Sequence, residues 1–182
     1  MIFANLISQI NMPTIAGILI IVLCIAGIIY LLYREVKASH ERERLAKKNM
    51  SFLESLNLTG LPIITFHNNG QTLNMVLDTG SNVCLINKQI LPKLKYSEGE
   101  SHTGIIGLSG TAEGGDTVLL PLSYKDRNFD FECWVTDLTE MVTSLKSEYG
   151  VTVHGLLGTG FFTKYKYILD FNDMIAYSLK KD

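Results

Sequence analysis

The sequence predicts an all-β domain that follows one transmembrane helix and a helical stalk, and three observations lead to this architecture. Residues 1–33 contain no charged side chain. Residues 34–58 are rich in Glu, Arg, Lys, Ala and Leu and contain neither Gly nor Pro, which favours a helix. From residue 59 onward, short β-branched, aromatic and aliphatic runs are broken by Gly and Asn, as in antiparallel β-structure. We therefore divide the chain into segments 1–33, 34–58 and 59–182.

Composition excludes several classes of protein. The chain has 182 residues, a formal net charge of −2 and 47% hydrophobic residues. A near-neutral chain lacks the positive field that nucleic-acid binding requires, and this hydrophobic fraction is too high for a disordered chain. The part after the stalk, about 120 residues, suffices for one compact core but not for two. We expect one folded domain and no nucleic-acid partner.

The uncharged segment contains a candidate membrane span at residues 14–33. As a helix it is long enough to cross roughly 30 Å of hydrocarbon. A signal peptide would carry Lys or Arg before a shorter apolar region and an Ala-x-Ala-like site after it, and the sequence has neither. A buried core helix would need a larger protein around it than the remaining chain supplies. We expect a single-pass helix embedded in the lipid bilayer.

Flanking charge predicts the orientation of this span. Basic residues follow it and none precedes it: Arg34, Lys37, Arg42, Arg44, Lys47 and Lys48. Basic residues next to a span stay in the cytoplasm, so we expect the 59–182 domain to be cytoplasmic. Because charge alone decides this, a periplasmic or extracellular domain is the open alternative. A parallel coiled coil is a further alternative for the stalk, although its apolar residues do not sustain a heptad.

The third segment contains a series of candidate strands. We predict strands at residues 61–66, 72–77, 83–86, 104–106, 117–123, 129–136, 167–171 and 175–179, with one helix between 138 and 149. Asn69-Gly70 marks the first hairpin, because a two-residue turn that matches the twist of the strands needs positive φ angles.

The residues most suited to chemistry are Asp78-Thr79-Gly80-Ser81, which lie between the apolar runs 73–77 and 82–86. An acid on a tight turn between two strands is held at the end of a rigid loop, next to hydroxyl groups that form hydrogen bonds. This arrangement suits a positioned general acid or base. The competing interpretation is an ordinary turn, in which Asp, Gly and Ser are common for backbone reasons.

With this motif, residues 61–179 resemble the retropepsin-like aspartic proteases of the pepsin clan. Residues 103–111, followed by 118–122, look like the glycine-rich flap hairpin that closes over the substrate in that family, and 129–137 is similar to the strand that follows. Residues 153–162 resemble the family's hydrophobic-hydrophobic-Gly motif, here Leu156, Leu157 and Gly158, and its short helix. The resemblance implies a closed, barrel-like single lobe with one or two short helices.

The resemblance also implies an aspartic endopeptidase that hydrolyses protein or peptide substrates with an activated water, without a cofactor or metal. Its mechanism needs two carboxylates, because a close pair shares one proton. The chain supplies one, Asp78, since Gly158 stands where a second motif at 158–160 would need an acid. A homodimer with one Asp78 per subunit is therefore implied. The alternative is a dimeric peptide-binding scaffold of the same fold without catalysis.

The resemblance assigns further roles residue by residue. Thr79 would brace the partner's loop, and the N–H of Gly80 would approach the carboxylate. Ser81 would donate a hydrogen bond to Asp78 and so lower the pKa values of the dyad. The expected flap residues, which would face the peptide, are Gly107, Leu108, Ser109 and Gly110, with Gly114-Gly115 as the alternative tip.

The remaining polar residues receive structural interpretations. The histidines have no Cys or Glu at metal-ligand spacing, so we expect no metal site. We expect Asp170 to make a structural hydrogen bond. Cys84 and Cys133 fall on predicted strands, where buried free thiols are ordinary in a reducing cytoplasm. The stretch 138–152 is an insertion relative to the minimal family members.

Overall fold

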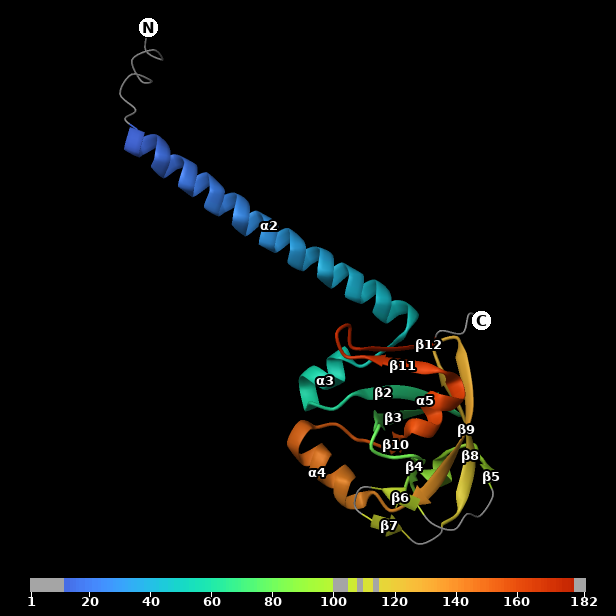
Figure 1. Cartoon of the computed structure of the whole chain (residues 1–182). Helices are drawn as coiled ribbons and strands as arrows, with labels where there is room; N and C mark the ends of the chain where they lie inside the picture. Colours follow the sequence, from blue (N-terminus) through green and yellow to red (C-terminus); the bar gives the residue numbers. More distant parts are fainter. Residues whose placement is uncertain (1–11, 100–104, 108–109, 113–114, 179–182) are drawn as a thin grey trace. The chain divides into compact units, whose positions relative to one another are not determined.

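The computed structural model describes residues 12–99, 105–107, 110–112 and 115–178 (Figure 1). These residues divide into two compact units, Met1–Leu45 and Ala46–Asp182.

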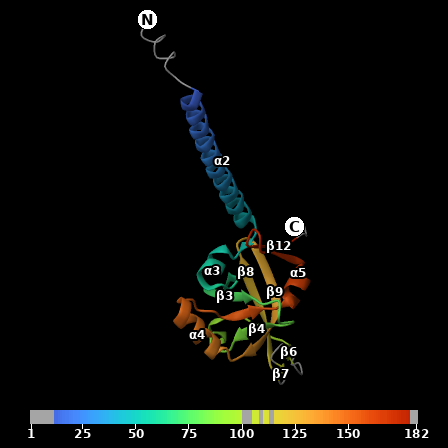
Figure 2. The same cartoon turned by 60° about the vertical axis from the view of Figure 1, so that its left-hand side comes forward.

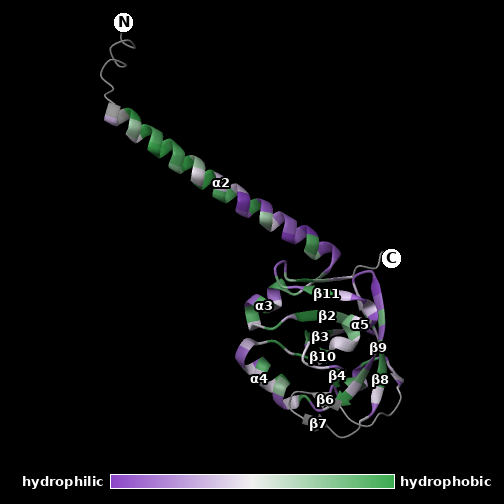
Figure 3. Ribbon diagram, viewed as in Figure 1, coloured by the Kyte–Doolittle hydropathy of each residue, from purple (hydrophilic) through white to green (hydrophobic). Residues whose placement is uncertain are grey.

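The first unit consists of helix α2 (Met12–Lys48), whose last residues belong to the second unit. Figure 3 shows a hydrophobic first part and a hydrophilic last part. The helix is long and apolar enough to span a membrane, and none of its apolar window is buried inside the protein. The large apolar side chains from Ile15 to Tyr33 are exposed, whereas a core helix would bury them.

The second unit is built around a closed ring of six strands. In spatial order these are β2 (Ile63–Asn68), β3 (Gln71–Leu77), β10 (Gly155–Leu157), β4 (Cys84–Asn87), β9 (Arg127–Thr136) and β8 (Thr117–Tyr124). The ring closes where His67 of β2 pairs with Ser123 of β8. A short strand, β5 (Ser97–Glu98), extends the sheet beyond β8. The expected mostly-β, barrel-like fold is confirmed.

Two smaller sheets complete the second unit. One has the order β1 (Met50–Ser51), β12 (Ile175–Ser178) and β11 (Tyr167–Asp170). The other is the hairpin of β6 (Ile105–Gly107) and β7 (Gly110–Ala112). The turn between β2 and β3 has positive φ at both Asn69 (49°) and Gly70 (79°), as predicted for this pair.

Short helices connect the strands. They are α3 (Leu53–Thr59), the 3-10 turn η1 (Leu91–Lys93), α4 (Thr139–Tyr149) and α5 (Thr159–Tyr165). Helix α4 confirms the helix expected between residues 138 and 149. Figures 1 and 2 place α4 and α5 on opposite sides of the strands β3, β10 and β4.

Aromatic side chains from the barrel and from α5 form a cluster in the main core. The rings of Phe66 (β2), Phe129 (β9) and Phe161 (α5) lie 5.5–6.1 Å apart between centroids, and all three are buried. Tilted and edge-to-face pairs at such distances are favourable beyond the area that they bury. These contacts fix α5 against the barrel wall.

The folded unit begins earlier in the chain than the sequence suggests. Helix α2 ends at Lys48, and the following Met50 and Phe52 are each only 1% exposed within the main core. The compact unit starts at Ala46, not at residue 59, and the continuous helical stalk expected over 34–58 is interrupted. This stretch is rich in good helix formers, so its composition predicts one continuous helix. The burial of Met50 and Phe52 in the core ends the helix instead.

Replacing Phe52 with Ala should therefore destabilise residues 46–182. Truncating a fully buried Phe typically costs about 3–5 kcal/mol, because apolar contact is lost and a cavity remains. Leu58→Ala is the matched control, since Leu58 is 58% exposed and surface changes usually stay within about 0.5 kcal/mol. Urea denaturation of a fragment beginning at Ala46 measures both. Equal losses for the two variants would place Phe52 outside the core.

Candidate active site

The Asp78 loop connects two strands that are not neighbours. Strands β3 and β4 lie on either side of β10, parallel and antiparallel to it, respectively. The loop must therefore pass the end of β10. Leu77 pairs with Leu157, and the N–H of Asp78 donates to the carbonyl of Leu157 at 2.9 Å. The backbone that carries the acid is thus fixed to a strand from the far end of the sequence.

Asp78 itself is partly exposed, and Thr79 and Gly80 after it are exposed. The N–H of Gly80 donates to Oδ1 of Asp78 at 2.9 Å, which is the approach that the sequence analysis expects of this residue. The contact orients the carboxylate within its own turn. The loop therefore presents an acid at the surface of the folded unit.

Ser81 differs from its expected role. Its hydroxyl donates to the carbonyl of Val83 at 2.8 Å and accepts from the N–H of Val83 at 3.3 Å. The single hydroxyl proton is therefore used within the loop and is not given to the carboxylate of Asp78. Ser81 therefore holds the turn into β4, and its hydroxyl donates to Val83 in place of the expected acceptor, Asp78.

The segment Leu156-Leu157-Gly158 forms most of β10 and its exit. Leu157 is fully buried in the main core, and Leu156 packs with a smaller cluster around Val76 and Val153. A Cβ on Gly158 would lie 2.2 Å from the carbonyl oxygen of Val83 and 2.8 Å from that of Ser81. Only glycine permits this approach between β10 and the Asp78 loop.

Thr159 makes a contact that sequence reasoning missed. Its N–H and its hydroxyl both donate to the carbonyl of Ser81, at 2.8 and 3.2 Å. The N–H of Gly160 reaches the carbonyl of Asn82 at 3.3 Å. The first residues of α5 thus tie down the middle of the Asp78 loop. Neither the hydrophobic-hydrophobic-Gly motif nor the missing acid at Gly158 predicts this contact of Thr159 with the Asp78 loop.

The strands β6 and β7 overlap the segment 103–111, for which the sequence analysis expects a flap. The two strands pair in an antiparallel manner, with Gly107 opposite Gly110. The expected tip residues Leu108 and Ser109 lie outside the described residues, as does Gly114 of the alternative tip. Gly115 lies beyond β7, against the ring of Trp134.

His154 fixes the start of β10 between its two neighbours. The ring nitrogen Nδ1 of His154 accepts the backbone N–H of Asn74 at 3.0 Å. The backbone N–H of His154 donates to the carbonyl of Asn74, and the backbone carbonyl of His154 accepts the N–H of Asn87. Burial lowers the pKa of the imidazole, so His154 is neutral with its proton on Nε2 near pH 7. This histidine has a structural role.

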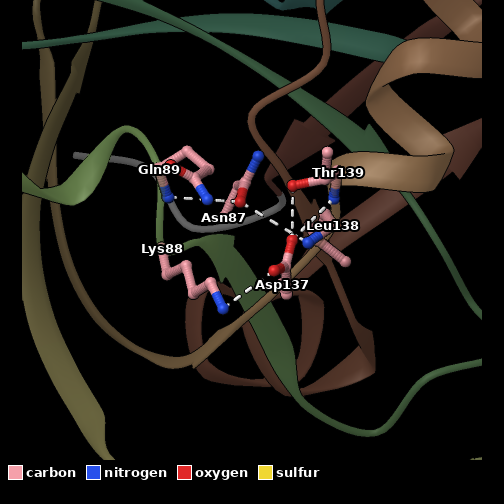
Figure 4. Close-up of polar contacts among 6 residues, drawn as sticks. All are labelled: Asn87, Lys88, Gln89, Asp137, Leu138 and Thr139. Carbon is pink, nitrogen blue, oxygen red and sulfur yellow. Dashed lines mark hydrogen bonds and ion pairs between the residues drawn. The ribbon is translucent and has the colours of Figure 1, made fainter.

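A polar cluster holds the start of the inserted helix α4 (Figure 4). The buried amide of Asn87 accepts from the N–H groups of Gln89 (3.2 Å) and Leu138 (3.4 Å) through its Oδ1. Lys88 forms a 2.8 Å ion pair with Asp137, whose other oxygen accepts the N–H and the hydroxyl of Thr139. The cluster joins the ends of β4 and β9. No sequence motif predicts it.

The contacts of Asp137 lower the pKa of its carboxyl to about 2, first through the hydrogen bond from Lys88 and then through those from Thr139. We expect Lys88→Met to raise this pKa part of the way toward its ordinary value of 3.8, because the Thr139 contacts remain. Lys88→Arg should keep it low. NMR titration of the Asp137 carboxyl carbon measures the change, and an unaltered value in Lys88→Met would contradict the assignment.

The same pKa has a consequence for stability. Because the folded-state pKa is lowered, the stabilisation is present above the unfolded pKa near 3.8 and is lost as the pH falls toward about 2. The Asp137 side chain is 47% exposed, so solvent screening keeps this contribution small.

Other residues singled out from the sequence are placed as follows. Oδ1 of Asp170 accepts the N–H groups of Asn172 (2.9 Å) and Asp173 (3.1 Å), which is the structural role expected of it. Cys84 and Cys133 are buried free thiols, as predicted. Within the part of the chain that the structure describes, no group of three or more His, Cys, Asp or Glu side chains could hold a metal ion.

Comparison with known proteins places this fold and this loop in a class. A family model described as aspartyl protease matches residues 64–161, which is more than half of the chain. The chain therefore belongs to this aspartyl protease family, and the resemblance drawn from the sequence is confirmed at that level. The matched segment contains Asp78, the hairpin and the Leu156-Leu157-Gly158 motif.

Solved structures include similar chains. EIAV protease in complex with the inhibitor HBY-793 is 23% identical, with a TM-score of 0.45, and the alignment covers 63% of this chain and 97% of that one. The retroviral protease-like domain of Ddi1 from Leishmania major is 10% identical, with a TM-score of 0.40 and coverage of 66% and 93%. Comparison with curated proteins finds no match.

Proposed function

We propose that this protein is a membrane-anchored aspartic endopeptidase that acts as a homodimer, with one Asp78 from each subunit. The observation that carries the proposal is the position of Asp78: a partly exposed acid on a loop that β3, β10 and α5 hold, in a chain of the aspartyl protease family. The Asp-Thr-Gly sequence occurs once, so a second carboxylate has to come from a second chain.

In the proposed mechanism the two Asp78 carboxyls share one proton, because like charges about 3 Å apart do not both ionise easily. The ionised carboxylate takes a proton from a bound water, whose oxygen attacks the peptide carbonyl. The protonated carboxyl gives its proton to the carbonyl oxygen. Collapse of the tetrahedral intermediate returns a proton to the leaving amine, breaks the C–N bond and restores the shared proton.

The neighbouring residues have supporting roles in this proposal. Gly80 orients the carboxylate through its N–H, and Ser81 and Thr159 keep the loop closed. The exposed Thr79 would brace the partner's loop across the two-fold axis. The β6–β7 hairpin would cover an extended peptide, with backbone groups of Gly107 and Gly110 facing it.

Helix α2 would anchor the enzyme in the membrane as a single span. Its apolar part is exposed and uncharged, and the basic residues after it favour a cytoplasmic domain. Confinement to a membrane raises the effective concentration of protomers, which promotes a weak dimer. Protein or peptide substrates near the membrane would then be cleaved.

The proposal is tested by incubating the purified chain with a peptide library from mildly acidic to neutral pH. We expect cleavage that depends on pH and is blocked by a statine-type inhibitor. Two protease domains joined in one chain serve as the second sample, because a weak dimer falls apart on dilution. Peptide binding without cleavage in both samples would instead indicate a non-catalytic scaffold.

A further inference from the structure

Two cysteines that the proposed mechanism does not use lie side by side next to the Asp78 loop. Cys84 opens β4 and is the direct register partner of Cys133 on the parallel strand β9. Both side chains are buried in the main core, with Cys84 4% and Cys133 0% exposed. We propose that Cys84 and Cys133 form a redox-active dithiol, which hydrogen peroxide closes to a disulfide that displaces the Asp78 loop.

The surroundings make Cys84 the thiol that reacts first. It lines a surface pocket of about 270 Å³, together with Asn82, Val83 and Lys164, and this volume exceeds that of a hydrogen peroxide molecule. Cys133 does not line this pocket and is fully buried. For Cys84, the interaction with Cys133, the backbone N–H groups of Gly158 and Phe161 and the charge of Lys164 outweigh the opposing effect of burial and lower its pKa. For Cys133, burial raises the pKa. The thiolate is the nucleophile, and its access governs oxidation.

The chemistry balances with hydrogen peroxide as the oxidant. The Cys84 thiolate attacks one peroxide oxygen, the O–O bond breaks, and Cys84 becomes a sulfenic acid while hydroxide leaves and takes up a proton. The sulfur of Cys133 then attacks the sulfur of Cys84, and the S–O bond breaks. The oxygen leaves as water with the Cys133 proton. Two electrons pass from the two thiols to the peroxide.

Closure of the disulfide would move the start of β4. Neighbouring strands lie about 4.8 Å apart, within the range of Cα separations that a disulfide allows, but its Cβ atoms must approach to about 3.8 Å. Cys84 directly follows Val83, whose carbonyl accepts the Ser81 hydroxyl and lies against Gly158. Drawing β4 toward β9 therefore disturbs the packing that holds the Asp78 loop. Strained disulfides of this kind are easily reduced, so the change is reversible.

The test uses the full-length chain in detergent, oxidised with hydrogen peroxide, alkylated and digested with trypsin. We expect a cross-link between peptides 49–88 and 128–146, which contain Cys84 and Cys133, and its loss on treatment with dithiothreitol. Cys84→Ala and Cys133→Ala should each abolish the cross-link, whereas Cys24→Ala, in the apolar helix, should retain it. Complete alkylation of both thiols after oxidation would overturn the dithiol.

The effect on the loop rests on the proposed function and is measured separately. Peptide cleavage by a portion of the oxidised chain that is neither alkylated nor digested should fall severalfold and recover with dithiothreitol, with no such response in Cys133→Ala. A cross-link that leaves cleavage unchanged would overturn the coupling to the loop. If the reduced chain cleaves no peptide, the endopeptidase assignment fails, and the cross-link still decides whether the dithiol exists.

Discussion

Asp78→Asn should abolish peptide cleavage. An amide cannot accept the proton of the attacking water, and the loss of general acid–base catalysis typically costs about 10²–10⁴-fold in rate. The fold should survive, because the amide oxygen of Asn still accepts the N–H of Gly80 and the backbone N–H of residue 78 still reaches Leu157. The rate of hydrolysis of a selected library peptide, with circular dichroism of the same sample, measures both properties.

Asp170→Asn is the matched control for this substitution. It removes a carboxylate from the same domain but keeps the Oδ1 acceptor for the N–H groups of Asn172 and Asp173. We expect its cleavage rate to equal that of the native chain. If Asp78→Asn cleaved as fast as Asp170→Asn, Asp78 would not be the catalytic acid.

Gly158→Ala should be among the most destabilising single-methyl additions in the chain. The new Cβ would lie 2.2 Å from the carbonyl oxygen of Val83, which is backbone and cannot rotate away. Overpacking of this kind costs about 1–3 kcal/mol, and more where backbone must shift. Because the displaced strand end carries Ser81 and the Asp78 turn, the cleavage rate should also fall. Urea denaturation and the peptide assay measure the two effects.

Gly115→Ala is the control for a methyl group placed on another glycine. Its Cβ would lie 3.5 Å from Cε3 of Trp134, an ordinary van der Waals contact, so we expect little change in the free energy of unfolding. A Gly158→Ala protein as stable as Gly115→Ala would show that the β10 exit does not press on the Asp78 loop.

Local sequence signals predicted the local features of the fold. Asn69-Gly70 fixed a hairpin because positive φ angles are a property of those two residues, and the apolar runs on either side of Asp78-Thr79-Gly80 located β3 and β4. The helix after β9 followed from a similar local pattern. Each of these features is determined by residues within a few positions of it in the sequence.

What the sequence did not reveal depends on contacts between distant segments. Strand β10 lies between β3 and β4 and pairs Leu157 with Leu77. A strand of three residues is too short for its sequence pattern to predict which strand it pairs with. Gly158 was noted for the missing acid, but its close approach to Val83 is visible only in three dimensions. Phe52 lies within a run of helix formers, and the residues that bury it, such as Phe171, are distant in the sequence.

The role of Ser81 shows the same limit within the site. The sequence places a hydroxyl three residues after the acid, and a hydrogen bond between them was a reasonable expectation. The turn instead directs the hydroxyl to Val83, because the backbone of the loop bends toward β4. The sequence shows that Ser81 can donate a hydrogen bond, but the conformation of the local backbone determines that Val83 accepts it.

A mixing experiment tests the central claim, an active site shared by two Asp78 residues, most directly. Native chain is mixed with increasing Asp78→Asn chain at constant total protein in detergent, and the subunits are left to exchange before peptide cleavage is measured. The account predicts that the rate falls with the square of the native fraction, because only dimers with two acids cleave. A rate proportional to the native fraction would contradict it, since each chain would then be active alone.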